Sequence, residues 1–299
     1  MPTSRYEAKD AGRGRSVMFA PEMHTVIEQR AELEHDLRNA IANEQLYLVY
    51  QPMFDLAQNT INGVEALLRW QHPTRGLIMP DEFIALAETT GLIVEIGRWV
   101  LDQACRQAAD WRQHNASLGI SVNVSPRQLD SDTDLLTHVQ TALTDSGLPP
   151  SALTLEITET MLMRDTQASA RQLHALKTLG VRIAIDDFGT GCCSLSYLQQ
   201  FPVDALKIDR SFITAIASNP ESGALIHTLV ALGKTLKIET LAEGIEDTSQ
   251  LHHLQREAFD SSQGYLFARP LSPAAITQLI TTEDEFDQGK PKAATAPSG

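Results

Sequence analysis

The chain has 299 residues, a formal net charge of −14 and a hydrophobic fraction of 42%. This length accommodates one large domain with flanking segments or two average domains, and the hydrophobic fraction is ordinary for a globular protein with a core. The acidic balance argues against binding to nucleic-acid polymers, although bound metal ions could still admit a small anionic ligand. No apolar run reaches the roughly 18 residues of a membrane span, and residues 1–15 lack the apolar middle of a secretory signal. We therefore expect a cytoplasmic protein without membrane contact in this segment, although domains outside it could tether it to a membrane.

The predicted elements begin with an amphipathic helix in residues 30–41, where Leu33, Leu37 and Ile41 recur every four residues. Short strand-like runs then alternate with helical ones. The predicted strands are Leu46–Tyr50, Ile61–Leu68, Ile120–Val124, Leu153–Ile157, Val181–Ile185, Ala205–Ile208, Glu239–Ala242 and Gly264–Phe267. The predicted helices are Asp81–Thr89, capped by Asp81, then Val94–Trp111, Leu135–Ser146, Thr166–Leu179, Ser222–Thr235 and Thr248–Glu257.

This alternation predicts an α/β fold, a TIM-like (β/α)8 barrel of roughly 240 residues. A doubly wound open sheet is the alternative, but no GxGxxG follows the first strand. We expect three segments: an N-terminal segment over residues 1–30 that precedes the barrel and is considered below, the barrel over 31–282, and a polar, disordered tail over 283–299. The cysteines Cys105, Cys192 and Cys193 form no CxxC pair, so they predict neither a disulfide framework nor a thiolate zinc site.

Polar side chains lie at or near the ends of the predicted strands, where the site of a parallel barrel is built. Strands buried on both faces should be apolar, because an ionised group inside one costs several kcal/mol unless it is paired or binds a metal. A single such residue could belong to a buried salt bridge, but a set on several neighbouring strands indicates a site. In strand order the set is Glu65 and Arg69, Asn123, Glu156 and Glu159, Asp186 and Asp187, Lys207 and Asp209, Glu243, and Gln263.

Several carboxylates converging on one point need a counter-charge. Carboxylate and amide oxygens suit Mg²⁺ or Mn²⁺ better than zinc, and two adjacent aspartates can bridge two ions. A pair of ions about 3.5–4 Å apart is the usual clamp for hydrolysing a phosphodiester. In this interpretation Lys207 orients the attacking water or offsets negative charge, and Arg69 grips a substrate phosphate. The alternative, a Schiff-base lysine, needs a depressed pKa, whereas a group of carboxylates raises the pKa of Lys207.

The chain also resembles the EAL-domain cyclic di-GMP phosphodiesterases over residues 33–279, because many of their motifs occur together and in order. These motifs are YQP at 50–52, EALLRW at 65–70, FIALAETTGLI at 83–93, SVNVSPRQL at 121–129, LEITET at 155–160, DDFGTG at 186–191, LKIDRSFI at 206–213, AEGIE at 242–246 and QGYLFARP at 263–270. The resemblance implies hydrolysis of one 3′–5′ phosphodiester of cyclic di-GMP to linear pGpG by a two-metal mechanism. It implies two Mg²⁺ or Mn²⁺ ions, inhibition by Ca²⁺, and a barrel whose first strand is antiparallel.

The resemblance also implies a role for each matching residue. Glu65, Asn123, Glu156 and Asp186 would bind the first metal, and Asp186 and Asp187 would share the second. Catalysis would involve Glu65, Asp187, Lys207 and Glu243, with Lys207 aiding the attacking water. Gln51, Leu68, Arg69, Asp209 and Gln263 would contact the substrate, Glu243 and Gln263 also completing the metal site through water. Glu159 would tether the loop that follows Asp187.

Two further expectations come from the same resemblance. The loop and helix after Asp187 are implied to form a homodimer interface, and Cys192 and Cys193 replace residues typical of that loop, which makes a redox-sensitive loop one hypothesis and neutral drift the other. Residues 6–19 resemble the end of a diguanylate cyclase (GGDEF) domain without the cyclase signature, so we expect upstream GGDEF and sensory domains in a longer signalling protein. A plain basic linker is the alternative for this segment.

Two other functions stay open because non-catalytic relatives exist. A catalytically silent module would bind cyclic di-GMP without turnover, and a scaffold would act through the helices without the nucleotide. Such relatives have usually lost metal ligands, whereas every ligand position is filled here. The sequence therefore favours the active phosphodiesterase.

Overall fold

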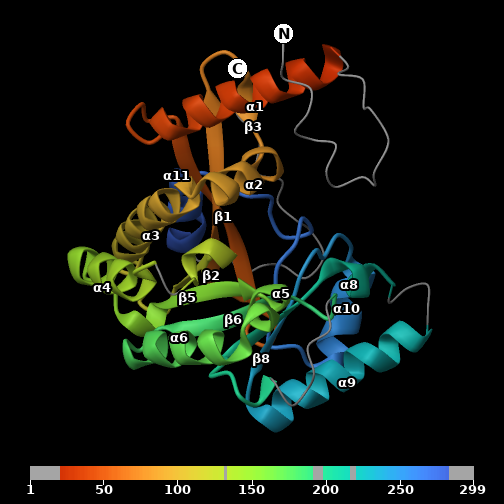
Figure 1. Cartoon of the computed structure of the whole chain (residues 1–299). Helices are drawn as coiled ribbons and strands as arrows, with labels where there is room; N and C mark the ends of the chain where they lie inside the picture. Colours follow the sequence, from red (N-terminus) through yellow and green to blue (C-terminus); the bar gives the residue numbers. More distant parts are fainter. Residues whose placement is uncertain (1–20, 131–132, 191–197, 216–219, 283–299) are drawn as a thin grey trace, which may run out of the picture.

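The computed structural model describes residues 21–130, 133–190, 198–215 and 220–282. Within these ranges, eight strands close a barrel and helices surround it, as predicted (Figure 1). The barrel strands are β1 (Leu46–Asp55), β2 (Thr60–His72), β4 (Gly119–Asn123), β5 (Leu153–Thr158), β6 (Arg182–Phe188), β7 (Ala205–Ile208), β8 (Glu239–Ala242) and β9 (Ser261–Ser262).

The first strand runs against its neighbours on both sides. β1 pairs antiparallel with β2 and with β9, whereas the pairs from β2–β4 round to β8–β9 are parallel. The expected antiparallel first strand is therefore confirmed. One consequence concerns the site: Gln51 lies directly opposite Glu65 in the β1–β2 ladder, so both side chains face the barrel interior.

The predicted last strand, Gly264–Phe267, is wrong. These residues form turns in which the amides of Phe267 and Ala268 both donate to the carbonyl of Gly264. The barrel is closed instead by the two residues of β9 just before them. The run looks strand-like because it is apolar, but Leu266 and Phe267 pack against the core without strand pairing, and the ring centroid of Phe267 lies 4.8 Å from that of Phe54.

The β1–β2 hairpin extends beyond the barrel and carries two elements on its far end. The short strand β3 (Gly76–Ile78) pairs antiparallel with β2, and helix α1 (Pro21–Asn39) lies across this end (Figure 1). Helix α1 is longer than the predicted helix. It is held by contacts from Asp36 Oδ2 to His72 Nε2 at 3.1 Å and from Glu32 to Arg75 at 3.2 Å.

Local capping signals place most of the remaining helices close to their predicted bounds. Two of them, α4 (Leu135–Ser146) and α10 (Thr248–Glu257), begin and end as predicted, because Asp134 and Asp247 cap their first turns. The predicted cap at Asp81 is wrong: Met79 is the N-cap residue, and the fixed φ of Pro80 suits the first helical position. The other helices are α2 (Pro80–Thr90), α3 (Leu92–Trp111), α5 (Glu159–Arg164), α6 (Thr166–Thr178), α8 (Arg210–Ala215), α9 (Pro220–Leu236) and α11 (Pro273–Thr281), with short 3₁₀ turns η2 (Pro126–Gln128) and η3 (Pro150–Ala152).

One hydrophobic cluster runs through the described residues and joins the outer faces of the strands to the helices. Its strand members include Ile120, Val122, Leu155 and Ile185, none more than 1% exposed. Lys207 is also among the fully buried side chains, at 1% exposure, and it is a cation. A lysine in this position requires buried negative partners, which directs attention to the barrel interior. None of the described helices is both long and apolar enough to cross a membrane.

Gly264 gives a test of the packing that follows β9. A Cβ at this position would collide with the backbone of Ile245, which cannot give way as a flexible side chain could. We expect Gly264→Ala to lower the free energy of unfolding by about 1–3 kcal/mol, measured by urea denaturation. Gly223→Ala in α9 is the matched control, because its Cβ meets nothing closer than 4.0 Å and should be neutral or stabilising. Equal stabilities of the two variants would contradict the packing described here.

Candidate active site at the barrel mouth

A cavity of about 320 Å³ opens at the end of the barrel where the parallel strands finish. The structure brings together eight of the residues singled out from the sequence on its walls. They are Gln51, Glu65, Asp186, Asp187, Lys207, Asp209, Glu243 and Gln263. Asn123 and Glu156 do not line the cavity but contact its walls directly.

Lys207 occupies the centre of the site. Its Nζ lies 2.6 Å from Glu156 Oε2, 2.8 Å from Glu243 Oε1, 3.1 Å from Asp186 Oδ1 and 3.5 Å from Glu65 Oε2. Burial lowers the pKa of Lys207, but attraction to these carboxylates outweighs burial and holds its pKa well above the ordinary value. Lys207 therefore keeps its charge near neutral pH, which argues against a Schiff-base nucleophile.

Glu65 is fixed by three donors: Lys207 of β7, described above, Asn123 at the end of β4 and Gln263 just after β9. Asn123 Nδ2 donates to Glu65 Oε1 at 2.8 Å, and Gln263 Nε2 donates to Glu65 Oε2 at 2.6 Å. Burial raises the pKa of Glu65, but Lys207 and these hydrogen bonds overcome it and lower the pKa below the ordinary value. Glu65 is therefore an oriented carboxylate anion. Because Asn123 and Gln263 use their amide nitrogens to bind it, their amide oxygens are not engaged by Glu65.

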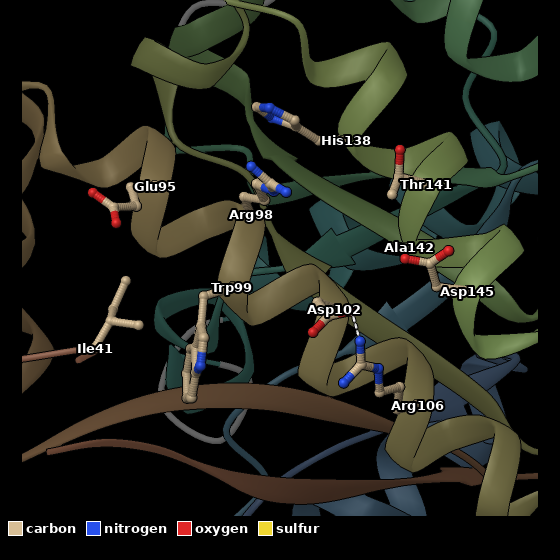
Figure 2. Close-up of a pocket in the computed structure, with 10 residues that line it drawn as sticks. All are labelled: Ile41, Glu95, Arg98, Trp99, Asp102, Arg106, His138, Thr141, Ala142 and Asp145. Atoms are coloured by element: carbon tan, nitrogen blue, oxygen red, sulfur yellow. Dashed lines mark ion pairs between the residues drawn. The ribbon is translucent and has the colours of Figure 1, made fainter. Parts of the chain in front are cut away.

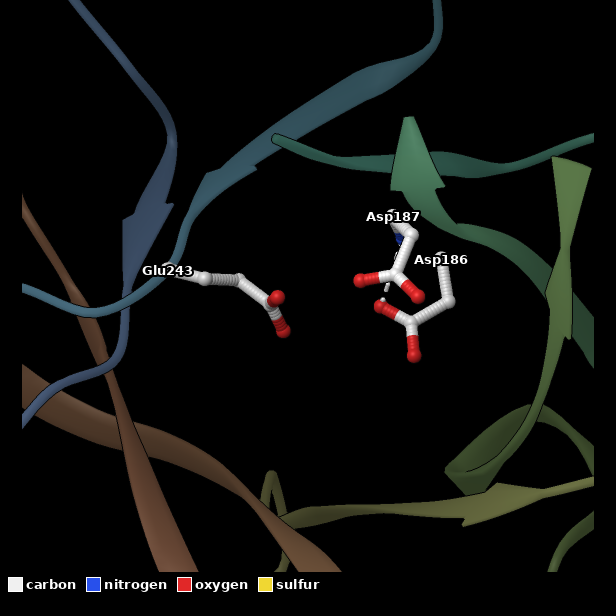
Figure 3. Close-up of side chains that lie close together, drawn as sticks. All are labelled: Asp186, Asp187 and Glu243. Carbon is white, nitrogen blue, oxygen red and sulfur yellow. Dashed lines mark hydrogen bonds between the residues drawn. The ribbon is translucent and has the colours of Figure 1, made fainter. Parts of the chain in front are cut away.

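Asp186 and Asp187 face the same cavity although they are adjacent on one strand. Successive strand residues normally point to opposite faces. Here the β6–β7 register shifts between Ile185 and Phe188, and Asp187 adopts a left-handed φ of 52°. The irregularity turns both carboxylates toward Glu243 (Figure 3), and oxygens of the three residues lie within 4.8 Å of one another.

The site has more carboxyl groups than its single buried cation can balance. Burial, followed by repulsion from Glu65, raises the pKa of Glu156 well above its ordinary value. Burial raises the pKa of Glu243 to about 7, and burial with repulsion from Asp186 raises the pKa of Asp187. The shared cause is crowding of negative charge in a poorly solvated cavity.

This donor set fits divalent cations. It offers carboxylate oxygens with amide oxygens from Asn123 and Gln263, the hard ligands that Mg²⁺ and Mn²⁺ take. Gln263 Oε1 is buried and has no hydrogen-bond partner among the described atoms, so the site contains an unused acceptor. An acidic cluster able to hold a metal is therefore present at the barrel mouth.

The loop after Asp187 is anchored at its start. Glu159, 2% exposed at the beginning of α5, accepts a hydrogen bond from the amide of Gly189 through Oε2 at 3.1 Å. Gly189 has a φ of 99° and lies against the ring of Phe212, so a side chain would not fit there. Cys192 and Cys193 lie outside the described residues, and so does the part of the expected dimer segment after Asp187 that spans residues 191–197.

Two predicted substrate residues do not line the cavity. Leu68 and Arg69 lie farther along β2, and the Arg69 guanidinium donates to the Leu68 carbonyl at 2.8 Å. The walls also include residues that our interpretation of the sequence missed, because it searched for acids and amides at strand ends. These residues are Arg210, Gly244, Glu246, Gly264 and Tyr265. Arg210 and Tyr265 could have been found as the basic and aromatic neighbours of Asp209 and Gln263 in their own motifs.

A second cavity, of about 300 Å³, lies on the outside of the barrel between α3 and α4 (Figure 2). Its walls carry both signs of charge, and Arg106 pairs with Asp102 one helical turn away at 2.9 Å. None of the buried carboxylates described above reaches it. The barrel mouth is therefore the better candidate for chemistry.

Comparisons with known proteins give matches of both sequence and structure. The EAL domain family matches residues 34–270. The bifunctional diguanylate cyclase/cyclic di-GMP phosphodiesterase MucR of Pseudomonas aeruginosa is 46% identical over 89% of this chain and 39% of its own length. The cyclic di-GMP phosphodiesterase PdeR of Escherichia coli is 37% identical over 92% of this chain and 41% of its own length. The chain thus spans about two fifths of these relatives.

A solved structure of the PaMucR phosphodiesterase in complex with c-di-GMP superposes with a TM-score of 0.78 at 46% identity. The match covers 82% of this chain and 99% of that one, so it includes nearly all of the relative's domain. Both the sequence and the structure of this chain therefore match the family. The matching chain is the one that has the antiparallel β1 and the acidic barrel mouth described above. The chain belongs to the EAL domain family.

Proposed function

We propose that this chain hydrolyses one 3′–5′ phosphodiester bond of cyclic di-GMP and releases linear pGpG. The observation that carries the proposal is the group of four carboxylates around Lys207, in a family whose members MucR and PdeR are named cyclic di-GMP phosphodiesterases. In the reaction a water oxygen bonds to phosphorus, the bond from phosphorus to the 3′ oxygen breaks, and the 3′ oxygen takes up a proton.

The donors divide into two groups that share Asp186. Glu65, Asn123, Glu156 and Asp186 would hold one ion, and Asp186 with Asp187 would hold a second, next to Glu243. We propose Mg²⁺ or Mn²⁺ for both. Bound there, the ions would activate water and stabilise the charge that develops on the phosphoryl oxygens.

Lys207 and Glu243 act beside these donors. Because Lys207 stays protonated, its Nζ can donate to the attacking water or to a phosphoryl oxygen, and it offsets negative charge as the transition state forms. Glu243 Oε1 lies 2.8 Å from Lys207 Nζ, so the two groups form a direct ion pair, and a water bound next to this pair could donate to Glu243. Gln263 supplies its unpaired Oε1 to the same region.

Gln51 and Asp209 line the cavity and would contact the substrate there. Arg69, with Leu68 beside it, would leave the Leu68 carbonyl to reach a substrate phosphate, because an arginine fork matches phosphate geometry better than it matches one carbonyl. Glu159 would hold the loop after Asp187 through Gly189.

The wider context is proposed on the same basis. MucR is named as both a cyclase and a phosphodiesterase and is a longer chain, which supports an upstream GGDEF domain for this protein, whereas upstream sensory domains stay a prediction. The origin of residues 1–30 in a GGDEF domain, a homodimer through the segment after Asp187 and a cytoplasmic location stay predictions.

Turnover separates the enzyme from a silent binding module. With Mn²⁺ present, the chain should convert cyclic di-GMP to pGpG. The product would be measured by chromatography. Glu65→Ala should reduce the rate by at least about a hundredfold, because Glu65 joins donors from three sides of the site. Glu82→Ala, on the exposed face of α2, is the control and should keep the parent rate. Tight nucleotide binding without product would instead support the silent module.

Metal substitution tests the two-ion proposal. Mg²⁺ demands near-octahedral geometry at about 2.0–2.1 Å, whereas Ca²⁺ takes more ligands at longer distances. Ca²⁺ should therefore bind but place substrate and water poorly. We expect activity after chelation to return with Mg²⁺ or Mn²⁺, and added Ca²⁺ to inhibit it in competition with them. Full activity with Ca²⁺ alone would count against the proposal.

The raised pKa of Glu243 predicts how metal and protons compete. The pKa of Glu243 is about 7 in the folded chain and 4.5 in the unfolded chain, so the folded chain binds the proton more tightly. Protonation of Glu243 therefore stabilises the folded chain, and this stabilisation is lost as pH rises through about 7. The loss is on the order of 3 kcal/mol. Metal binding should offset it, so the rise in melting temperature caused by Mg²⁺ should be larger at pH 8 than at pH 5.5. A shift independent of pH, measured by calorimetry, would contradict this linkage.

A further inference from the structure

The motif at residues 83–93 carries a glutamate that the proposed mechanism does not use. Glu88 lies in the last turn of α2, where Gly91, with a left-handed φ of 79°, ends the helix. Its carboxylate reaches the loop that follows β4: Ser125 Oγ donates to Glu88 Oε1 at 2.8 Å. Ser125 Oγ also accepts from the amide of Arg127 at 3.2 Å, so one hydroxyl joins α2 to the start of η2.

The same loop is held from its other side by Gln128. The amide of Ser125 donates to Gln128 Oε1 at 3.1 Å, which completes a capping box on η2. Gln128 is 3% exposed, and its side chain lies over Gly97 of α3, where a Cβ would collide with it. Ser125 is therefore held through its hydroxyl by Glu88 of α2 and through its amide by Gln128 of η2, which packs against α3.

Ser125 lies two residues from Asn123. The β4–β5 ladder supports the loop as far as Val124, whose amide donates to the carbonyl of Glu156 at 2.9 Å. Asn123 is exposed at the barrel mouth, and its amide nitrogen is engaged by Glu65. The direction of its oxygen depends on the backbone around it, which the Val124 amide holds on the C-terminal side and the hydrogen bonds of Ser125 hold one residue later.

We propose that Glu88 is a positioning residue for the metal site, acting through Ser125 on the backbone that carries Asn123. This inference rests on the proposed function, because it takes Asn123 as a metal ligand. The carboxylate acts here as a hydrogen-bond acceptor, and its charge is not required. Outer residues that orient a ligand typically contribute tenfold to a hundredfold to metal affinity.

Binding of Mn²⁺ in the absence of nucleotide tests this role apart from turnover. We would titrate Mn²⁺ by calorimetry into the parent chain, Glu88→Ala, Glu88→Gln and Ser125→Ala, with Glu82→Ala as the matched control on the same helix. We expect about tenfold weaker binding for Glu88→Ala and for Ser125→Ala. Glu88→Gln keeps an acceptor oxygen and should bind as the parent does, as should Glu82→Ala. The double variant Glu88→Ala/Ser125→Ala should bind no more weakly than either single variant, because both remove one hydrogen bond.

The outcomes separate this inference from the function on which it rests. Parent-like Mn²⁺ affinity in Glu88→Ala or in Ser125→Ala, with the parent chain active, would overturn the positioning role alone. An equal loss in Glu88→Gln and Glu88→Ala would also overturn it, since charge rather than the acceptor would then matter. A parent chain that neither binds Mn²⁺ nor cleaves cyclic di-GMP would overturn the proposed function itself. If Glu88→Ala fails to fold, Ser125→Ala and Glu88→Gln still decide the question.

Discussion

The whole barrel interior depends on one buried cation surrounded by acids. Lys207 contacts Glu65, Glu156, Asp186 and Glu243 at 2.6–3.5 Å while it is 1% exposed. A lysine buried this deeply would lose its proton without these partners, and the partners would repel one another without the lysine. The residual negative charge, visible in the raised pKa values of Glu156 and Glu243, makes the site receptive to divalent cations.

Backbone irregularity supplies what regular strands could not. A regular strand would aim only one of Asp186 and Asp187 into the cavity, and the shifted register of β6 with the left-handed φ of Asp187 aims both. The antiparallel β1 makes a similar contribution by setting Gln51 opposite Glu65. Both features give up local regularity and place polar groups where a phosphodiester could be held.

The surroundings of the site are arranged in successive layers. Glu65 is oriented by Asn123 and Gln263. Asn123 ends strand β4, and two residues later Ser125 is held by Glu88 of α2 and by Gln128 of η2. Glu159 connects α5 to Gly189 in a comparable way, just after Asp187 of β6. Hydrogen bonds to neighbouring elements thus hold the segments that follow the candidate ligands.

The sequence by itself determined the alternation of strands and helices, the bounds of helices such as α4 and α10, and the acids and amides at the strand ends, because hydrophobic periodicity and capping are local properties. Residues 264–267 were misassigned because an apolar run that packs against the core through turns has the same composition as one that pairs in a sheet. Only the tertiary structure decided the two-residue strand β9, the turn of Asp187 into the cavity and the contact from Glu88 to Ser125. Each of these depends on a partner distant in the sequence, and no local pattern records which residue that partner is.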